Sequence, residues 1–142
     1  MRSQWVGLLL LGAHVSAATG ADASVQKQYE LVTETVMPHL EENLRYATTR
    51  ENRCVDTHDL SRAFPILRHV ALADCALVKA QEGNGGAIYT LQCTGGHGTT
   101  GLAQWQFDAN SIAGTLNVRL GGKNMTFYQR VTGRLIGACQ DL

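Results

Sequence analysis

The feature that most constrains the fold is the stretch "DCALVKAQEGNGGAIYTLQC", residues 74–93, which carries a cysteine near each end. Its centre is rich in glycine and both flanks are rich in strand-favouring residues, a pattern typical of a β-hairpin. Directly opposed residues in an antiparallel hairpin have position numbers of constant sum, and pairing the two cysteines centres the turn on Asn84. The opposed pairs are then Cys75 with Cys93, Leu77 with Leu91, and Lys79 with Tyr89.

The other two cysteines complete a disulfide scheme. The chain has four cysteines, and four cysteines allow three pairings. The hairpin register selects Cys75–Cys93 and leaves Cys54–Cys139 as the second bridge. A zinc site or a thioredoxin-like redox pair would call for closely spaced cysteines such as C-x-x-C, and the sequence has none. We therefore predict two structural disulfides, which require an oxidising compartment.

The N-terminus predicts export. Arg2 precedes a short apolar run, "WVGLLLLG", and Val15-Ser16-Ala17 supplies the small residues of a signal-peptidase site. We predict a signal peptide over residues 1–17, with cleavage after Ala23 as the alternative, followed by one domain over residues 24–142. The apolar run is shorter than the ~20 residues of a membrane span, so we expect none in the mature chain. The expected location is the periplasm or the extracellular medium.

Charge argues against several classes of partner. The chain has twelve basic and twelve acidic residues. Removing Arg2 with the signal peptide leaves eleven against twelve, a formal charge of −1. The charges are interspersed and form no basic patch, so nucleic acid and anionic membranes are poor candidates. No motif predicts a cofactor.

The first half of the mature chain is harder to interpret. Apolar residues spaced three and four apart fit one helix face (Val25, Tyr29, Val32, Val36 and Leu40), whereas "YELVTETV" favours a strand. The segment "VDTHDLSRAFP" predicts a short helix near residues 57–64. Asp56 or Thr57 would cap this helix, Leu60 and Phe64 would be buried on one side, and Pro65 would end it.

The second half predicts a β-meander. Strands are expected over Ala73–Ala80, Ala87–Cys93, Gly101–Phe107, Ile112–Leu120 and Met125–Thr132, separated by turn sequences such as "DANS" and "GGKN". A constant sum of 219 in the second hairpin sets Trp105 over Gly114, with Phe107 facing Ile112 and Ala103 facing Leu116. The predicted fold class is mainly β (α+β), with an antiparallel meander forming a curved sheet or partial barrel.

Few residues suggest chemistry. His58 lies between acidic residues in "DTHD" (Asp56–Asp59), and His97 lies in the glycine-rich segment "GGHGTT". Either could act as a general base or a metal ligand, but the "DTHD" pattern is better explained as the solvated first turn of a helix. No other residue can be nominated to work with His97. The sequence contains neither a nucleophile elbow nor a P-loop.

The order of these features resembles a family of small exported proteobacterial proteins known only as a domain of unknown function. The matching elements are Met37-Pro38, "CVDTHDL" (Cys54–Leu60), the hairpin cysteines Cys75 and Cys93, Gly114–Leu116, and "GRLIGAC" (Gly133–Cys139). The resemblance implies a periplasmic, mainly β fold with strands around Gln28–Val36 and Leu44–Arg53. It implies no activity and no catalytic residue.

The leading functional expectation is a non-enzymatic binding or accessory domain for an apolar ligand or an envelope protein partner. Its expected surface is the apolar face that carries Trp105, Phe107, Met125 and Phe127, although these residues could equally fill the core. A metal-handling protein or a hydrolase-type enzyme using His58 or His97 with a nearby Asp is the alternative. A third possibility is an envelope assembly or stress protein.

Overall fold

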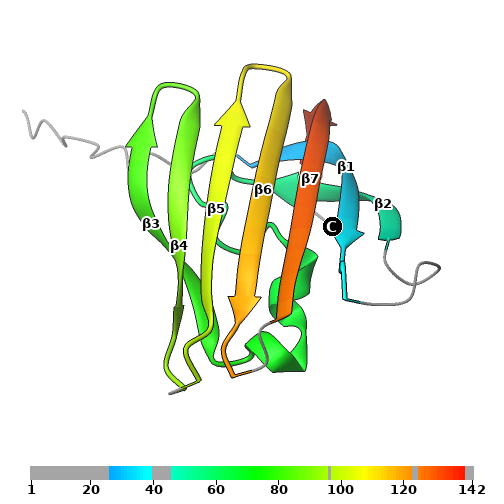
Figure 1. Cartoon of the computed structure of the whole chain (residues 1–142). Helices are drawn as coiled ribbons and strands as arrows, with labels where there is room; N and C mark the ends of the chain where they lie inside the picture. Colours follow the sequence, from blue (N-terminus) through cyan, green and yellow to red (C-terminus); the bar gives the residue numbers. More distant parts are fainter. Residues whose placement is uncertain (1–25, 40–45, 96, 123–124, 140–142) are drawn as a thin grey trace, which may run out of the picture.

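The protein is a single antiparallel sheet of seven strands, described here from a computed structural model (Figure 1). The structure describes residues 26–39, 46–95, 97–122 and 125–139. The strands are β1 (Lys27–Val36), β2 (Tyr46–Val55), β3 (Cys75–Gly83), β4 (Gly86–Cys93), β5 (Thr100–Phe107), β6 (Ser111–Leu120) and β7 (Met125–Ala138). Two short 3-10 helices, η2 (Pro65–Arg68) and η3 (Val70–Leu72), lie between β2 and β3. The predicted signal peptide falls on residues outside those described.

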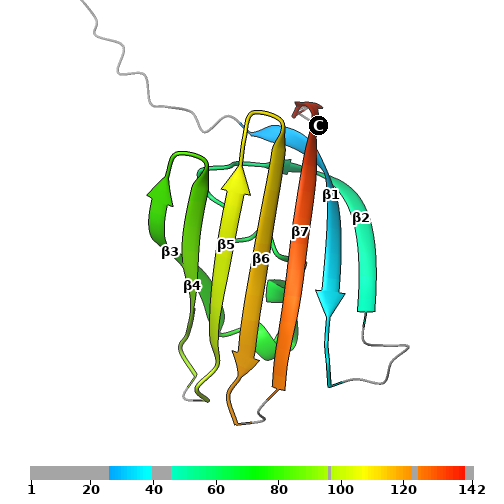
Figure 2. The ribbon, with the colours of Figure 1, turned by 45° about the horizontal axis from the view of Figure 1, so that its top comes forward.

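The strand order is β2-β1-β7-β6-β5-β4-β3. Strands β3 to β7 follow one another as the predicted meander, and β1 then pairs with β7, which brings the two ends of the domain together. Among the described residues the sheet stays open, with β2 and β3 as its edges. Strands β1 and β2 curve strongly along their length (Figure 2). The open, curved sheet confirms the predicted fold class and assigns strands to the ambiguous N-terminal region.

The predicted registers are confirmed. Cys75 faces Cys93, Leu77 faces Leu91 and Lys79 faces Tyr89. In the next hairpin Trp105 faces Gly114, and a Cβ added to Gly114 would lie 2.5 Å from Cδ2 of the indole. One detail of the first hairpin was wrong, because the register shifts by one residue between Lys79 and Gln81. This bulge moves the turn from a centre on Asn84 to the pair Asn84-Gly85, with Gly85 at φ +80°.

The segment between β2 and β3, residues 56–74 (the connector), covers one face of the sheet (Figure 1). Its buried apolar residues join the alternating inward residues of the strands in one core. The sheet side of that core includes Tyr29, Leu31, Leu77, Tyr89, Leu91, Ala103, Trp105, Ile112, Leu116, Val118 and Val131. The connector side comprises Leu60, Ala63, Phe64 and Leu72. An antiparallel sheet with one face covered and one exposed gives the alternating pattern seen in the sequence.

The predicted helix near residues 57–64 is wrong. In its place the chain makes consecutive turns, in which Asp56 Oδ1 accepts the N–H of His58 and Asp59 Oδ1 accepts that of Ser61. Short polar side chains compete in this way with the helical backbone pattern. Pro65 begins η2 rather than ending a helix, in keeping with the preference of proline for the first helical turn. Leu60 and Phe64 are nevertheless buried, as predicted.

Side chains of the sheet hold the connector in place by bonding to its backbone. Arg53 of β2 donates to the carbonyl of Ala63 at 2.8 Å. The buried Tyr89 hydroxyl accepts the N–H of Leu60 at 3.1 Å. Gln129, which is also buried, accepts the N–H of Ile66 at 3.2 Å through Oε1. These bonds satisfy polar groups of an irregular segment that would otherwise be costly to bury.

Candidate functional site

Both predicted disulfides are present, as Cys54–Cys139 and Cys75–Cys93, and no cysteine is free. Cysteine binds a metal as its thiolate, and neither bridge offers one. The sulfur atoms of Cys75 and Cys93 lie with an oxygen of Asp74 inside 4.8 Å, but this grouping is a disulfide beside a carboxylate. Asp74 Oδ2 is engaged by the N–H of Gly95 at 2.7 Å. The hairpin cysteines are therefore structural.

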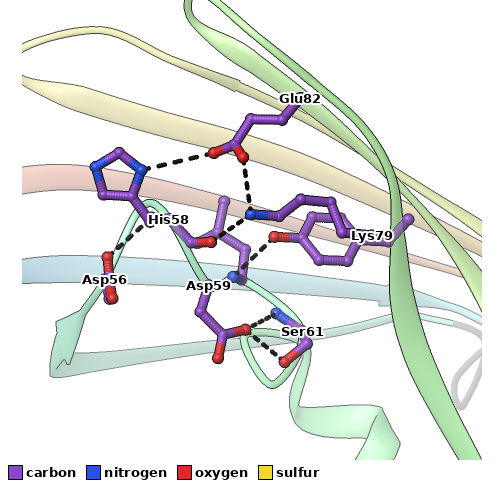
Figure 3. Close-up of polar contacts among 8 residues, drawn as sticks. Asp56, His58, Asp59, Ser61, Lys79 and Glu82 are labelled. Atoms are coloured by element: carbon purple, nitrogen blue, oxygen red, sulfur yellow. Dashed lines mark hydrogen bonds and ion pairs between the residues drawn. The ribbon is translucent and has the colours of Figure 1, made fainter. Parts of the chain in front are cut away.

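The surroundings of His58 are a polar network on the surface (Figure 3). His58 Nδ1 lies 3.5 Å from Glu82 Oε1, and its ring is 80% exposed. The ammonium of Lys79 lies between Glu82 Oε2, at 3.2 Å, and the carbonyl oxygen of His58, to which it donates. The network thus joins the connector to β3, and Lys79 is its centre.

The interactions within the network favour the charged forms of Glu82 and Lys79. The hydrogen bond from Lys79 and the positive charge of its ammonium lower the pKa of Glu82, with a smaller contribution from His58. Desolvation opposes the charged form of Lys79, but the hydrogen bond to Glu82 and the surrounding negative charges outweigh it and raise the pKa of Lys79. Both shifts favour charge, whereas a general acid or base at neutral pH needs a pKa near 7.

The network also lacks a nucleophile. Ser61 donates its hydroxyl proton to Asp59 at 2.6 Å, and no described contact joins Ser61 to His58. The bonds from the hydroxyl and backbone N–H of Ser61 lower the pKa of Asp59, which leaves this carboxylate a poor base. A serine is activated when a base accepts its proton and a third group orients that base, and Asp59 here stabilises a turn. A solvated turn is the better description of "DTHD", although it is not the first turn of a helix as predicted.

His97 lies apart from His58. It is exposed in the connection between β4 and β5, whereas Glu82 and His58 lie near the β3–β4 turn, at the other end of β4. The backbone of His97 packs against Gly121, where an added Cβ would overlap its carbonyl oxygen. The structure therefore does not bring the two predicted histidines into one site.

The predicted apolar surface divides into two parts. Trp105 is only 2% exposed and packs against Phe64 with ring centroids 4.9 Å apart, so it belongs to the core; Phe107 is half-buried beside that core. The indole N–H of Trp105 has no hydrogen-bond partner among the described residues. Met125 and Phe127, at the start of β7, instead line a pocket.

This pocket, which we call the β7 pocket, has a volume of about 200 Å³. It lies where the connector meets the start of β7 and the end of β6. Its lining is largely apolar and comprises Met37, His39, Ile66, His69, Ala71, Leu72, Leu120, Met125, Thr126 and Phe127. Leu72 and Phe127 are themselves buried, so the pocket extends into the edge of the core. A dry apolar cavity of roughly 150 Å³ is enough to bind a molecule the size of benzene.

Gln129 holds one wall of the β7 pocket in place. Its amide accepts the N–H of Ile66 in η2 and donates to Thr35 Oγ1 of β1 at 2.9 Å. One buried side chain therefore joins the connector, β7 and β1 next to the pocket. A pocket with walls fixed in this way is formed before a ligand binds, which reduces the ordering cost of binding.

The polar groups of the β7 pocket are few. His69 accepts the N–H of Ala71 through Nδ1 at 3.1 Å, which places the proton of the neutral ring on Nε2. His39 Nε2 lies 3.5 Å from Thr126 Oγ1. His69 can therefore offer a donor to a ligand but is poorly arranged to ligate a metal through Nε2. Sequence analysis identified Met125 and Phe127 and missed both histidines, because residues 37–39 and 66–72 are far from β7 in the chain.

A second and larger hollow, of about 640 Å³, lies on the exposed face of the sheet. Its lining includes Val36, Pro38, Leu102, Asn117, Arg119 and Tyr128. It is a broad surface depression rather than an enclosed cavity, and no buried polar group of the described chain is directed into it. The β7 pocket is therefore the better candidate for a binding site.

Comparison of the chain with known protein families, with curated proteins and with solved structures found no match. The resemblance to an exported proteobacterial family thus stays a prediction. Within the described residues, no helix is long and apolar enough to cross a membrane. The two disulfides are compatible with a location outside the cytoplasm.

Proposed function

We propose that the chain is an exported, non-enzymatic binding domain and that the β7 pocket is its ligand site. The ligand is a small apolar molecule, or the end of an aliphatic chain, that carries a hydrogen-bond acceptor. The observation that carries this proposal is a preformed apolar pocket whose described polar side chains are His39, His69 and Thr126. Ligand sites in proteins commonly combine an apolar lining with a few polar groups that orient the ligand.

The enzymatic and metal-handling alternatives have less support. His58 is exposed and tied to Glu82, and His97 lies at the other end of β4. Neither belongs to an enclosed pocket with a nucleophile or with further ligands in the described part of the chain. Among the described residues that line it, the β7 pocket has no carboxylate and no thiolate.

The proposal can be tested by titrating the purified, disulfide-bonded protein with octanoate and with octanol, followed by NMR chemical shifts of the backbone amides. We expect saturable shifts that concentrate on residues 37–39, 66–72 and 125–127. Octanoate should bind more tightly than octanol, because its carboxylate is the stronger acceptor for the N–H of His69. Saturable shifts elsewhere, or no saturable binding of either compound, would contradict the proposal.

A substitution that fills the pocket provides the matched control. Ala71→Phe places an aromatic ring in the β7 pocket, whereas Ala76→Phe makes the same change on the exposed face of β3. The ring would occupy space that a ligand needs, so Ala71→Phe should lower the affinity by about tenfold or more, equivalent to about 1.4 kcal/mol of binding free energy. Ala76→Phe should bind as the unaltered protein does. Equal binding by both variants would exclude the β7 pocket as the site.

A further inference from the structure

The edge strand β2 is unusually accessible. Seven consecutive residues, 46–52, are exposed on both faces of the sheet, and the strand buries only Val55 fully. Its ten residues pair with β1 in an uninterrupted register. No other described strand pairs with it. Every second residue therefore directs its backbone N–H and C=O away from β1 toward the free edge.

Proteins usually protect such an edge. They do so with proline, lysine, a bulge, a short strand or a covering segment, because an exposed regular edge pairs readily with another strand. Tyr46–Val55 contains no proline, glycine or lysine, and its register shows no bulge. The connector reaches only the end of this strand, where Arg53 bonds to Ala63. In the part of the chain that the structure describes, the charged side chains of Arg50 and Glu51 are the only protection of residues 46–52.

We propose that β2 is an interaction surface that pairs antiparallel with β2 of a second copy of this chain. In a two-fold symmetric antiparallel pair, one residue must face its own equivalent in the partner strand, because hydrogen-bonded and non-hydrogen-bonded pairs alternate along the ladder. The two-fold axis passes midway between these two residues. The exposed stretch 46–52 has Thr49 at its midpoint, so pairing centred there uses the whole exposed stretch and stays clear of the connector.

The charges of β2 support this centre over the two residues that follow it. Pairing centred on Thr49 places Arg50 opposite Thr48, Glu51 opposite Ala47, and threonine opposite threonine. Centring on Arg50 or on Glu51 would instead place two like charges opposite each other, which destabilises a strand pair. The chain is also close to neutral overall, so long-range repulsion between copies is small. An edge contact of seven residues lies at the small end of protein interfaces, so we expect a weak dimer, with dissociation in the micromolar range or above.

The proposed register predicts that two substitutions of Thr48 change the dissociation constant of the dimer in opposite directions. Thr48→Lys would place a lysine opposite Arg50 twice in the dimer, and Thr48→Glu would place a glutamate there. Opposed pairs of this kind change the dissociation constant by about fivefold in total, upward for Thr48→Lys and downward for Thr48→Glu. Sedimentation velocity over a concentration series measures both. The controls are Gln104→Lys and Gln104→Glu, which make the same changes in charge on the exposed face of β5, away from the edge.

Amide hydrogen exchange supplies a second measurement on the unaltered protein. Raising the protein concentration should slow exchange within residues 46–52 and leave residues 76–82 of β3 unchanged. A chain that stays monomeric at millimolar concentration would overturn the proposal. Pairing of β2 with a different protein only, and not with a second copy, would overturn it too. A dimer in which the Thr48 variants behave like the Gln104 variants would overturn it as well.

Discussion

The two edge strands of the sheet differ in what keeps them in place. Strand β3 buries Leu77 in the core, bonds to the connector through Lys79 and has a bulge between Lys79 and Gln81. Strand β2 exposes seven consecutive residues on both faces, buries only Val55 at its end, and is attached mainly by its backbone bonds to β1. Each edge strand thus buries one residue, and they differ in that Lys79 also links the middle of β3 to the connector.

A disulfide also attaches each edge strand to the rest of the sheet. Cys75–Cys93 joins β3 to its hairpin partner β4, where Leu77 and Leu91 already pack together. Cys54–Cys139 joins β2 to the end of β7, across β1, because Gln28 of β1 faces both Cys54 and Gly137. The second bridge therefore gives the largely exposed β2 a covalent attachment in addition to its backbone bonds to β1. The comparison teaches that an edge strand with little core contact depends on a covalent link.

The largest effect is expected from removing the bridge at β2. The double substitution Cys54→Ser with Cys139→Ser opens a loop with a sequence separation of 85 residues, and the chain-entropy model assigns it about 4.5 kcal/mol of unfolding free energy. Urea unfolding at neutral pH measures the loss. Amide exchange of the variant should accelerate first in residues 46–55, before the rest of the sheet.

The matched control removes the other bridge. Cys75→Ser with Cys93→Ser opens a separation of only 18 residues, and the same model assigns it about 3 kcal/mol. Because Leu77 and Tyr89 remain buried, β3 should stay in register in this variant. If β3 exchanged as fast as β2 does in the first variant, the argument that burial holds β3 would be wrong.

A smaller effect is expected from truncating the core residue of β3. Leu77→Ala removes a side chain that is 5% exposed and should cost about 3 kcal/mol of stability. Thr49→Ala, at the middle of β2, should change stability by less than about 0.5 kcal/mol because Thr49 is exposed. Thermal unfolding of the two variants side by side tests the contrast, and equal losses would contradict it.

Smaller again is the contribution of the bond from β2 to the connector. Arg53→Leu removes the donor to the Ala63 carbonyl and should cost about 1 kcal/mol, because a half-buried acceptor then loses its partner. Arg50→Leu removes an exposed arginine that pairs only weakly with Glu30, and should change stability little. Chemical denaturation of both variants provides the measurement. A larger loss of stability in Arg50→Leu would contradict the prediction that Arg53 contributes more than Arg50.

Much of the meander could be predicted from local pattern alone. The constant-sum rule gave the registers of two hairpins, since opposed side chains must share a face. The predicted last strand ended at Thr132, just before Gly133, whereas β7 continues to Ala138. Gly133 is required by packing, since a Cβ there would lie 2.6 Å from Ile112 and 2.8 Å from Leu31. Those neighbours belong to β6 and β1, which no local pattern reveals.

The candidate site was only half predictable for a related reason. Met125 and Phe127 follow the alternation of one strand, which local sequence shows. His39 and His69 reach the β7 pocket from a turn after β1 and from the connector, whose path depends on Gln129 and Tyr89. The connector was expected to begin with a helix, and its turns are set by aspartate side chains and by the sheet beneath it. Irregular segments of this kind are specified by tertiary contacts rather than by periodicity.

The smallest expected effect concerns the polar link between the connector and β3, and it depends on pH. The pKa of Glu82 is lowered below its ordinary value of 4.5 by the hydrogen bond and charge of Lys79. A group with a lower pKa in the folded state stabilises the protein above its unfolded pKa, and this contribution disappears as the pH falls through the folded pKa. Glu82→Gln should therefore slightly destabilise the protein near pH 6, and the difference should vanish toward pH 3.

A double-mutant cycle distinguishes this link from a general effect of charge. In the background of Lys79→Met, Glu82→Gln should show a much smaller pH-dependent difference, because Lys79 is the main cause of the lowered pKa and His58 a minor one. Urea unfolding at a series of pH values between 3 and 6 measures all four proteins. A pH-dependent difference that persists undiminished without Lys79 would show that another group holds Glu82 charged. The lowered pKa of Glu82 would then not depend on Lys79, which links β3 to the connector.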